Sequence, residues 1–125
     1  GKPITVYGDG KQVRDVLYIS DLIRLFETVI EKIQISRGKI YNIGGGVNNT
    51  LAVWTQFGLL LENLFGRKIK VSHADWRPGD QKVYISDITL VEKELGWKPE
   101  IGVADGVKKL FTWVQRNRKM FAKFF

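Results

Sequence analysis

The chain alternates between short runs rich in β-branched and aromatic residues and longer stretches whose apolar residues recur at helical spacing. A switch between these two periods is typical of folds that mix strands and helices. Strand character is found in residues 4–7, 13–19, 39–46, 69–73 and 83–85. Helical spacing is found in residues 21–37, 50–65, 87–95 and 107–114. This order predicts an α/β or mixed α+β fold with few short strands and about four helices.

Glycine and small polar residues mark where these elements begin and end. The triplet Gly8-Asp9-Gly10 predicts a turn between the first two strands. Thr50 is predicted to cap the second helix and Ser86-Asp87 the third, and Gly66 and Gly96 are predicted to end these helices. The first helix is predicted to have one apolar stripe, made of Leu22, Phe26, Val29, Ile30 and Ile33.

The composition is that of one globular domain, 1–125, since 44% of the 125 residues are hydrophobic and 26% are charged. No apolar run approaches the ~20 residues that cross a bilayer, and the first ten residues lack the apolar core of a signal peptide. We therefore expect no membrane association. The absence of cysteine excludes disulfides, thiolate metal sites and cysteine nucleophiles, and it agrees with a cytoplasmic location. The single histidine, His73, is more typical of a structural residue than of a metal ligand.

Most of the net charge of +7 belongs to the C-terminal end of the chain. Residues 106–125 contain six lysines and arginines and no acid, so the first 105 residues carry only +1. Nucleic acid is therefore not favoured as a partner, because the positive charge does not spread over a whole face. A basic module that uses the helical tail 115–125 on nucleic acid or an anionic surface remains an alternative.

The sequence lacks the usual frames of a dinucleotide-dependent active site. Gly44-Gly45-Gly46 follows a predicted strand, but the third glycine position of a dinucleotide loop is occupied by Asn49. Tyr7 and Lys11 have the Tyr-x-x-x-Lys spacing of an oxidoreductase, yet a glycine turn separates them. That chemistry needs both side chains on one helical face, so we expect no catalytic residue and no bound cofactor in this chain.

Two other stretches carry residues suited to binding a nucleoside diphosphate. Arg14 lies at the start of the second strand, and Pro78-Gly79 predicts a tight turn that places Arg77 and Asp80 toward the same point. A guanidinium matches the oxygens of a phosphate, and a carboxylate accepts hydrogen bonds from vicinal ribose hydroxyls. A surface turn with an Arg77–Asp80 ion pair explains the same residues, and residue chemistry alone leaves both interpretations open.

Five motifs resemble, in order, the C-terminal part of the extended short-chain dehydrogenase/reductases that act as NAD-dependent nucleotide-sugar epimerases and dehydratases. They are GDGKQVRDVLYISDL, YNIGGGVNNTLAV, DWRPGDQKVYISDI, KELGWKP and DGVKKLFTWV. The resemblance covers roughly residues 3–115, and within the group it is greatest to CDP-paratose (CDP-tyvelose) 2-epimerases. A UDP-, GDP- or dTDP-sugar 4-epimerase or 4,6-dehydratase is the alternative.

This resemblance implies that Arg14, Arg77 and Asp80 contact the nucleoside diphosphate of a nucleotide sugar, with a CDP-sugar favoured. It also implies that the chain is the C-terminal substrate-binding portion of a Rossmann-type enzyme. The glycine-rich NAD loop and the catalytic Tyr-x-x-x-Lys of the family precede the part that this chain resembles. The NAD-binding domain is then absent from the chain, which we expect to be inactive by itself.

The same resemblance implies that the segment KIYNIGGG adds a strand to the sheet of the NAD-binding domain. Without that domain, Ile40, Tyr41 and Ile43 form an unpaired edge and the stripe of the first helix loses part of its cover. We therefore expect a homo-oligomer whose interface includes residues 22–43. The aromatic tail offers a second candidate surface, formed by Phe121, Phe124 and Phe125.

Overall fold

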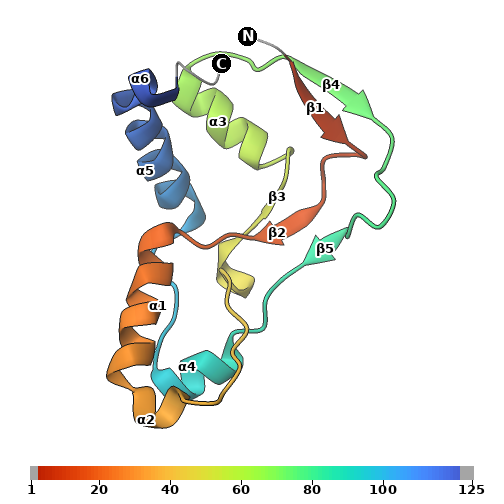
Figure 1. The fold of residues 1–125 in the computed structure, drawn as a ribbon. Helices are drawn as coiled ribbons and strands as arrows, with labels where there is room; N and C mark the ends of the chain where they lie inside the picture. Colours follow the sequence, from red (N-terminus) through yellow and green to blue (C-terminus); the bar gives the residue numbers. More distant parts are fainter. Residues whose placement is uncertain (1–2, 122–125) are drawn as a thin grey trace.

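The computed structural model describes residues 3–121, which form a mixed α/β fold as predicted (Figure 1). The strands are β1 (Ile4–Tyr7), β2 (Val13–Asp15), β3 (Thr50–Ala52), β4 (Val71–Ala74) and β5 (Val83–Tyr84). The helices are α1 (Ile19–Glu31), α2 (Ile33–Ser36), α3 (Phe57–Phe65), α4 (Thr89–Leu95), α5 (Val103–Arg116) and α6 (Arg118–Phe121), with a 3-10 turn η1 (Val47–Asn49). The four predicted helices correspond to α1, α3, α4 and α5, and the two further helices are single short turns.

The strands form two small sheets. In the first, β1 pairs in parallel with β4, from Ile4 opposite Val71 to Tyr7 opposite Ala74. In the second, β2 lies between β3, to which it is antiparallel, and β5, to which it is parallel. The predicted turn at Gly8–Gly10 is present, and it passes the chain from one sheet to the other (Figure 1). Gly8 and Gly10 both have positive φ there, a conformation that favours glycine.

The buried core lies between α1 and α4. Leu25 of α1 packs with Val91, Leu95 and Trp97, and each of these side chains is almost inaccessible to solvent. Figure 1 shows α1, α2 and α4 gathered at one end of the molecule, away from the strands. Gly96 ends α4 in the left-handed conformation, as predicted, and so turns the chain to place Trp97 against α1.

The buried carboxylate of Asp21 ties α1 to the segment that leads into α5. It accepts hydrogen bonds from the backbone N–H groups of Glu100 (3.1 Å) and Ile101 (2.9 Å) and from the side chain of Arg24 (3.0 Å). Burial by itself raises the pKa of Asp21, but these hydrogen bonds outweigh it and hold the pKa below its ordinary value. The indole N–H of Trp97 donates to the backbone carbonyl of Asp21 at 3.0 Å.

The strand predicted for residues 39–46 is wrong, because the structure assigns this segment no strand and it pairs with none of the described strands. A side chain holds the segment instead. The hydroxyl of Tyr41 donates to the carboxylate of Glu94 on α4 at 2.7 Å. Burial and this hydrogen bond raise the pKa of Tyr41 to about 12. Ile40 is 89% exposed, so the segment is not the buried strand that its composition indicates.

Two other predicted boundaries also need correction. The strand predicted for 13–19 ends at Asp15, because α1 already begins at Ile19. Thr50 does not cap the second helix, since it lies in β3 opposite Asp15 and α3 begins only at Phe57. The cap predicted at Ser86-Asp87 is correct only in part, since the N-cap residue of α4 is Ile88 and the Ser86 hydroxyl donates to the carbonyl of Ile43. The carboxylate of Asp87 does accept the backbone N–H of Thr89, the first residue of α4.

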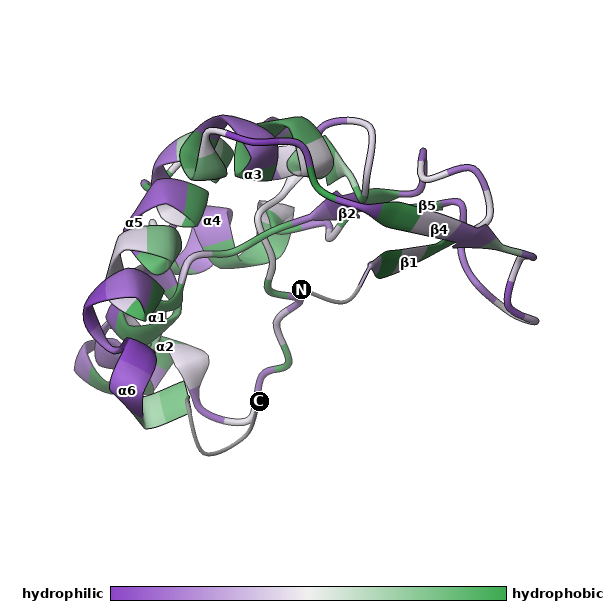
Figure 2. Cartoon of the chain, turned by 90° about the horizontal axis from the view of Figure 1, so that it is seen from above, coloured by the Kyte–Doolittle hydropathy of each residue, from purple (hydrophilic) through white to green (hydrophobic). Residues whose placement is uncertain are grey.

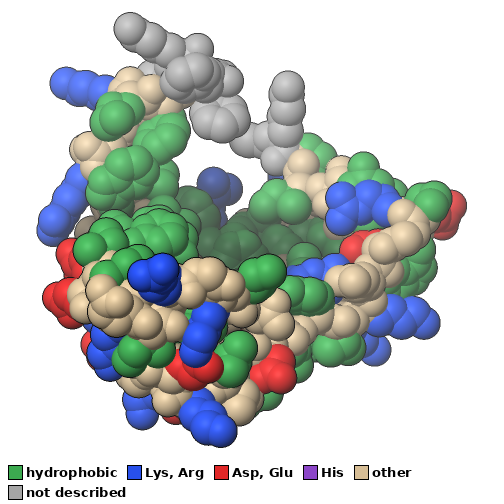
Figure 3. Space-filling model, turned by 60° about the horizontal axis from the view of Figure 1, so that its bottom comes forward, with side chains coloured by type: hydrophobic (Ala, Val, Ile, Leu, Met, Phe, Trp, Pro, Cys, Tyr) green, Lys and Arg blue, Asp and Glu red, His purple; other side chains and the backbone are tan. Residues whose placement is uncertain are grey.

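The predicted stripe of α1 is only partly buried. Leu22 and Val29 pack toward the core, whereas the adjoining part of the stripe exposes a row of apolar side chains. This outer apolar face consists of Ile19, Ile23, Phe26 and Ile30 of α1 and of Ile33, the first residue of α2. Figure 2 shows hydrophobic and hydrophilic residues alternating around the turns of α1 and α5. Figure 3 shows hydrophobic side chains gathered around a hollow in the surface.

None of the described helices has both the length and the apolar content that crossing a bilayer requires. The basic tail 115–125 includes the end of α5 and the whole of α6. Phe121 packs edge-on against Trp113, with ring centroids 5.7 Å apart. Phe124 and Phe125 lie outside the described residues.

Candidate functional site

Strand β2 carries two adjacent charged residues, Arg14 and Asp15. Side chains alternate between the faces of a strand, so Arg14 and Asp15 project in opposite directions. Arg14 forms an ion pair with Asp80, with 3.0 Å between Nη2 and Oδ1. Its other terminal nitrogen, Nη1, donates to the backbone carbonyl of Val13 at 2.8 Å. The guanidinium of Arg14 is therefore held in a fixed orientation.

The turn predicted at Pro78-Gly79 brings Arg77 to the same carboxylate. The backbone N–H of Asp80 donates to the carbonyl of Arg77 at 3.1 Å, and Gly79 has the positive φ that such a turn favours. Nη2 of Arg77 lies 3.5 Å from Oδ2 of Asp80. The structure therefore brings Arg14, Arg77 and Asp80 together, and their contact with a ligand stays a prediction.

These charges border a cavity of about 370 Å³ between the two sheets and α3. Its other walls are mostly apolar and aromatic: Ile4, Thr5, Val6, Tyr7, Gln12, Val53, Trp54, Phe57 and Leu61. The guanidinium of Arg77 lies over the ring of Tyr7, 4.8 Å from its centroid. The arrangement combines two cations that can hold an anion with an aromatic surface that suits a planar heterocycle.

Sequence reasoning gave no site role to Tyr7 or Gln12. Tyr7 entered only as a false match to an oxidoreductase motif, and the turn at Gly8–Gly10 carries Lys11 away from it. Gln12 is buried, and its Nε2 donates to the backbone carbonyl of Tyr7 at 2.6 Å. Its Oε1 has no hydrogen-bond partner among the described residues. A polar residue between two short strands is the only sequence signal that could have drawn attention to Gln12.

The glycine loop 44–46 is packed against its own chain. The carboxylate of Asp15 accepts the backbone N–H of Gly46 at 3.0 Å. A Cβ on Gly44 would collide with Asp15 and Ser86, and one on Gly45 would collide with the carbonyl of Val16. A 3-10 turn rather than an α-helix follows the loop. These residues therefore do not fit the diphosphate of NAD, which needs open backbone N–H groups at a helix N-terminus.

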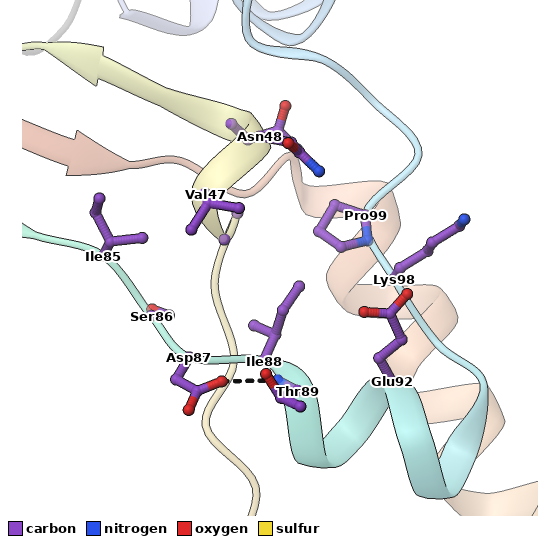
Figure 4. Close-up of a pocket in the computed structure, with 13 residues that line it drawn as sticks. Val47, Asn48, Ile85, Ser86, Asp87, Ile88, Thr89, Glu92, Lys98 and Pro99 are labelled. Carbon is purple, nitrogen blue, oxygen red and sulfur yellow. Dashed lines mark hydrogen bonds between the residues drawn. The ribbon is translucent and has the colours of Figure 1, made fainter.

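A second cavity, of about 460 Å³, lies beside this loop (Figure 4). Asn48 of η1 lines it on one side, and Glu92 of α4 and Lys98 line it on another (Figure 4). Asp87 also lines it, and hydrogen bonds from Thr89 hold the pKa of Asp87 below its ordinary value. Among residues 3–121, no cluster of three or more side chains could hold a metal ion.

The sequence model of a family described as "GDP-mannose 4,6 dehydratase" matches residues 1–110. The chain belongs to this family.

Members with different activities are similar to this chain. CDP-paratose 2-epimerase of Salmonella typhi is 37% identical over 112 residues, which are 90% of this chain and 33% of that protein. A dTDP-glucose 4,6-dehydratase of Streptomyces griseus is 35% identical over 118 residues, which are 94% of this chain and 35% of that protein. The chain thus spans about a third of the length of the curated relatives that it matches.

Solved structures of nucleotide-sugar enzymes are also similar to this chain. The UDP-glucuronic acid 4-epimerase of Bacillus cereus, in complex with UDP-glucuronic acid and NAD, superposes with a TM-score of 0.82 at 28% identity. The match covers 92% of this chain and 36% of that enzyme. The predicted resemblance to NAD-dependent nucleotide-sugar epimerases and dehydratases is confirmed. The fold is that of a part of these Rossmann-type enzymes.

Proposed function

We propose that this chain is the nucleotide-sugar-binding region of an NAD-dependent nucleotide-sugar epimerase similar to CDP-paratose 2-epimerase. The observation that carries the proposal is the cluster of Arg14, Arg77 and Asp80 at the edge of the 370 Å³ cavity. Two guanidiniums there can each donate hydrogen bonds to a diphosphate, and the carboxylate can accept from ribose hydroxyls. The cavity volume lies in the range of small-molecule sites, ~300–1,000 Å³.

In such an enzyme these residues would anchor the part of the substrate that does not react. Binding energy from a remote nucleotide can hold the sugar in one orientation at the distant reacting carbon. NAD, when bound in such an enzyme, supplies reversible hydride transfer with the sugar. Because the glycine loop 44–46 does not fit NAD, we propose that NAD is held by a part of the family that this chain does not cover.

A CDP-sugar is the proposed substrate because the 37% identity to a CDP-paratose 2-epimerase accompanies the motifs around Arg14 and Arg77. UDP- or dTDP-sugar chemistry is the alternative within the family, since a dTDP-glucose 4,6-dehydratase is 35% identical. Titration with CDP, UDP, dTDP and GDP separates these possibilities by the order of their affinities.

A basic binding module is the candidate from a different class. One observation favours it, a cavity of about 420 Å³ on α5 that Lys108, Lys109, Trp113 and Arg116 help to line. Asp105 lies in the same cavity and pairs with Lys109 at 2.8 Å, which reduces its positive charge. A steep salt dependence of nucleic-acid binding that disappears on removal of residues 116–125 would support this function.

We also propose that residues 1–125 act as one nucleotide-sugar-binding domain and that the chain self-associates. The outer apolar face of α1 and the unpaired segment 39–46 support this, because both leave apolar side chains in water. The cytoplasmic location expected from the sequence stays a prediction.

Nuclear magnetic resonance with CDP tests the proposed function. We expect the backbone amide signals that shift on titration to belong to residues around the cavity, namely 4–7, 12–14 and 77–80. Shifts confined to α5, at 108–116, would support the basic module instead. No shift at millimolar CDP would contradict nucleotide binding by this chain.

A further inference from the structure

The carboxylate of Asp80 bridges two guanidiniums, with one oxygen directed at each. Oδ1 lies 3.0 Å from Nη2 of Arg14, and Oδ2 lies 3.5 Å from Nη2 of Arg77. The side chain of Asp80 is only 12% exposed, whereas those of Arg14 and Arg77 are 31% and 62% exposed. The carboxylate is therefore the most deeply placed of the three charges, in a position between the two cations.

A phosphate group would need the same donors. Carboxylate and phosphate oxygens both accept charge-assisted hydrogen bonds from the guanidinium fork, so they compete for it. Two of the five N–H donors of Arg14 are engaged, one on Nη1 with the carbonyl of Val13 and one on Nη2 with Asp80. A diphosphate that bridges both guanidiniums would occupy the position of the Asp80 carboxylate, whose negative charge opposes it, so we expect binding to move Asp80 away from at least one arginine.

We propose that Asp80 regulates access to this site as an internal competitor that takes the place of a phosphate between Arg14 and Arg77. This inference rests on the proposed function. Pro78 and Gly79 separate Arg77 from Asp80, and the exposed side chain of Arg77 can move without disturbing the core. The exchange therefore needs movement only at the turn and in two side chains.

The competition selects for ligands that contain a nucleoside. A nucleoside diphosphate that displaces the carboxylate brings ribose hydroxyls, which give Asp80 new hydrogen-bond donors. Inorganic pyrophosphate displaces the same carboxylate but has no ribose hydroxyls that could donate hydrogen bonds to it. Asp80 therefore disfavours inorganic phosphates more than nucleoside diphosphates, although both carry the anion that the arginines bind.

Calorimetric titration of the 125-residue chain with CDP and with pyrophosphate tests this inference. We expect Asp80→Asn to bind pyrophosphate about fivefold more tightly than the wild type, and to lose part of the wild-type preference for CDP. Asp80→Ser provides a second variant that, like Asp80→Asn, is neutral at position 80. Circular dichroism reports whether each variant is folded. Asp75→Asn is the matched control, because Asp75 lies in the same loop and forms no ion pair within residues 3–121.

The outcomes separate this inference from the proposed function. If the wild type binds CDP but neither folded Asp80 variant binds pyrophosphate more tightly, the competitor role is wrong and nucleotide binding stands. If Asp75→Asn has the same effect as Asp80→Asn, net charge explains the change and the competitor role is again wrong. If the wild type binds neither ligand, both proposals are wrong.

Discussion

Arg14 and Asp80 are 66 positions apart in the sequence, and a 3.0 Å ion pair joins their side chains. The pairing of β2 with β5 brings them together, because Arg14 lies opposite Tyr84 in the parallel register. The loop that carries Arg77 and Asp80 immediately precedes β5 and therefore passes the exposed end of Arg14. The candidate site consequently exists only when the small three-stranded sheet is formed.

Asp21 is predicted to be important for stability rather than for binding. Asp21→Ala leaves the partly buried backbone N–H groups of Glu100 and Ile101 without their acceptor, and a donor left unsatisfied in this way costs at most about 1–3 kcal/mol. We expect a clear loss in the free energy of unfolding, measured by urea denaturation. Glu100→Ala is the control, because it removes only an exposed partner of Arg24. Equal stability of the two variants would contradict the structural role of Asp21.

The pKa of Asp21 predicts how stability depends on pH. Its pKa in the folded chain is below the ordinary value of 3.8, so the ionised carboxylate stabilises the fold above that value. This contribution is lost as the pH falls through the lower folded pKa. We expect the free energy of unfolding to fall more steeply between about pH 5 and pH 2 in the wild type than in Asp21→Asn. Parallel curves would show that other carboxylates dominate.

The outer apolar face of α1 is predicted to mediate self-association. Phe26 and Ile30 are 56% and 71% exposed, so a charge on either residue should weaken the interface. We expect Phe26→Glu and Ile30→Glu to weaken association by about tenfold or more in sedimentation velocity. Glu27→Ala, a polar position on the same helix, is the control. A wild type that stays monomeric at high micromolar concentration and melts cooperatively would show that this face is not an interface.

The isolated chain is predicted to have no epimerase activity and no affinity for NAD. Tyr7 and Lys11 flank a turn instead of sharing a helical face, and the loop 44–46 is closed by Asp15 and Ser86. We expect no epimerised product after incubation with NAD and CDP-sugars, and no heat of NAD binding. Any turnover by the purified chain would show that this expectation is wrong.

Local sequence signals predicted much of the fold. The turn at Gly8–Gly10 and the left-handed residues Gly66 and Gly96 were predictable, because their backbone conformations depend on the residue itself. Residues 39–46 have strand composition, but a strand also needs a neighbour to pair with, and no described strand lies beside them. The prediction of Thr50 as a helix cap is wrong because Thr50 lies in β3 and pairs with Asp15 of β2, which outweighs its local preference.

The candidate site was predictable only in part. The Arg77–Asp80 contact could be predicted, because both residues flank one tight turn. The contact of Asp80 with Arg14 depends on sheet pairing between distant segments, which no local pattern records. Asp21 lies at the start of a predicted helix, and its hydrogen bond with Arg24 is local, but its other three hydrogen bonds depend on residues 97–101, far away in sequence.

Calorimetric titration of CDP into the chain and its Arg77→Ala variant tests the central claim most directly. Arg77 contributes a charged donor beside Asp80 at the cavity, and its loss should cost about 1.5–3 kcal/mol of binding free energy. Arg37→Ala removes an equal charge from an exposed position outside the cavity and should leave the affinity unchanged. The account predicts binding of CDP by the wild type and by Arg37→Ala, with much weaker binding by Arg77→Ala. Equal affinities of the wild type and Arg77→Ala would show that the arginine–aspartate cluster is only a surface turn.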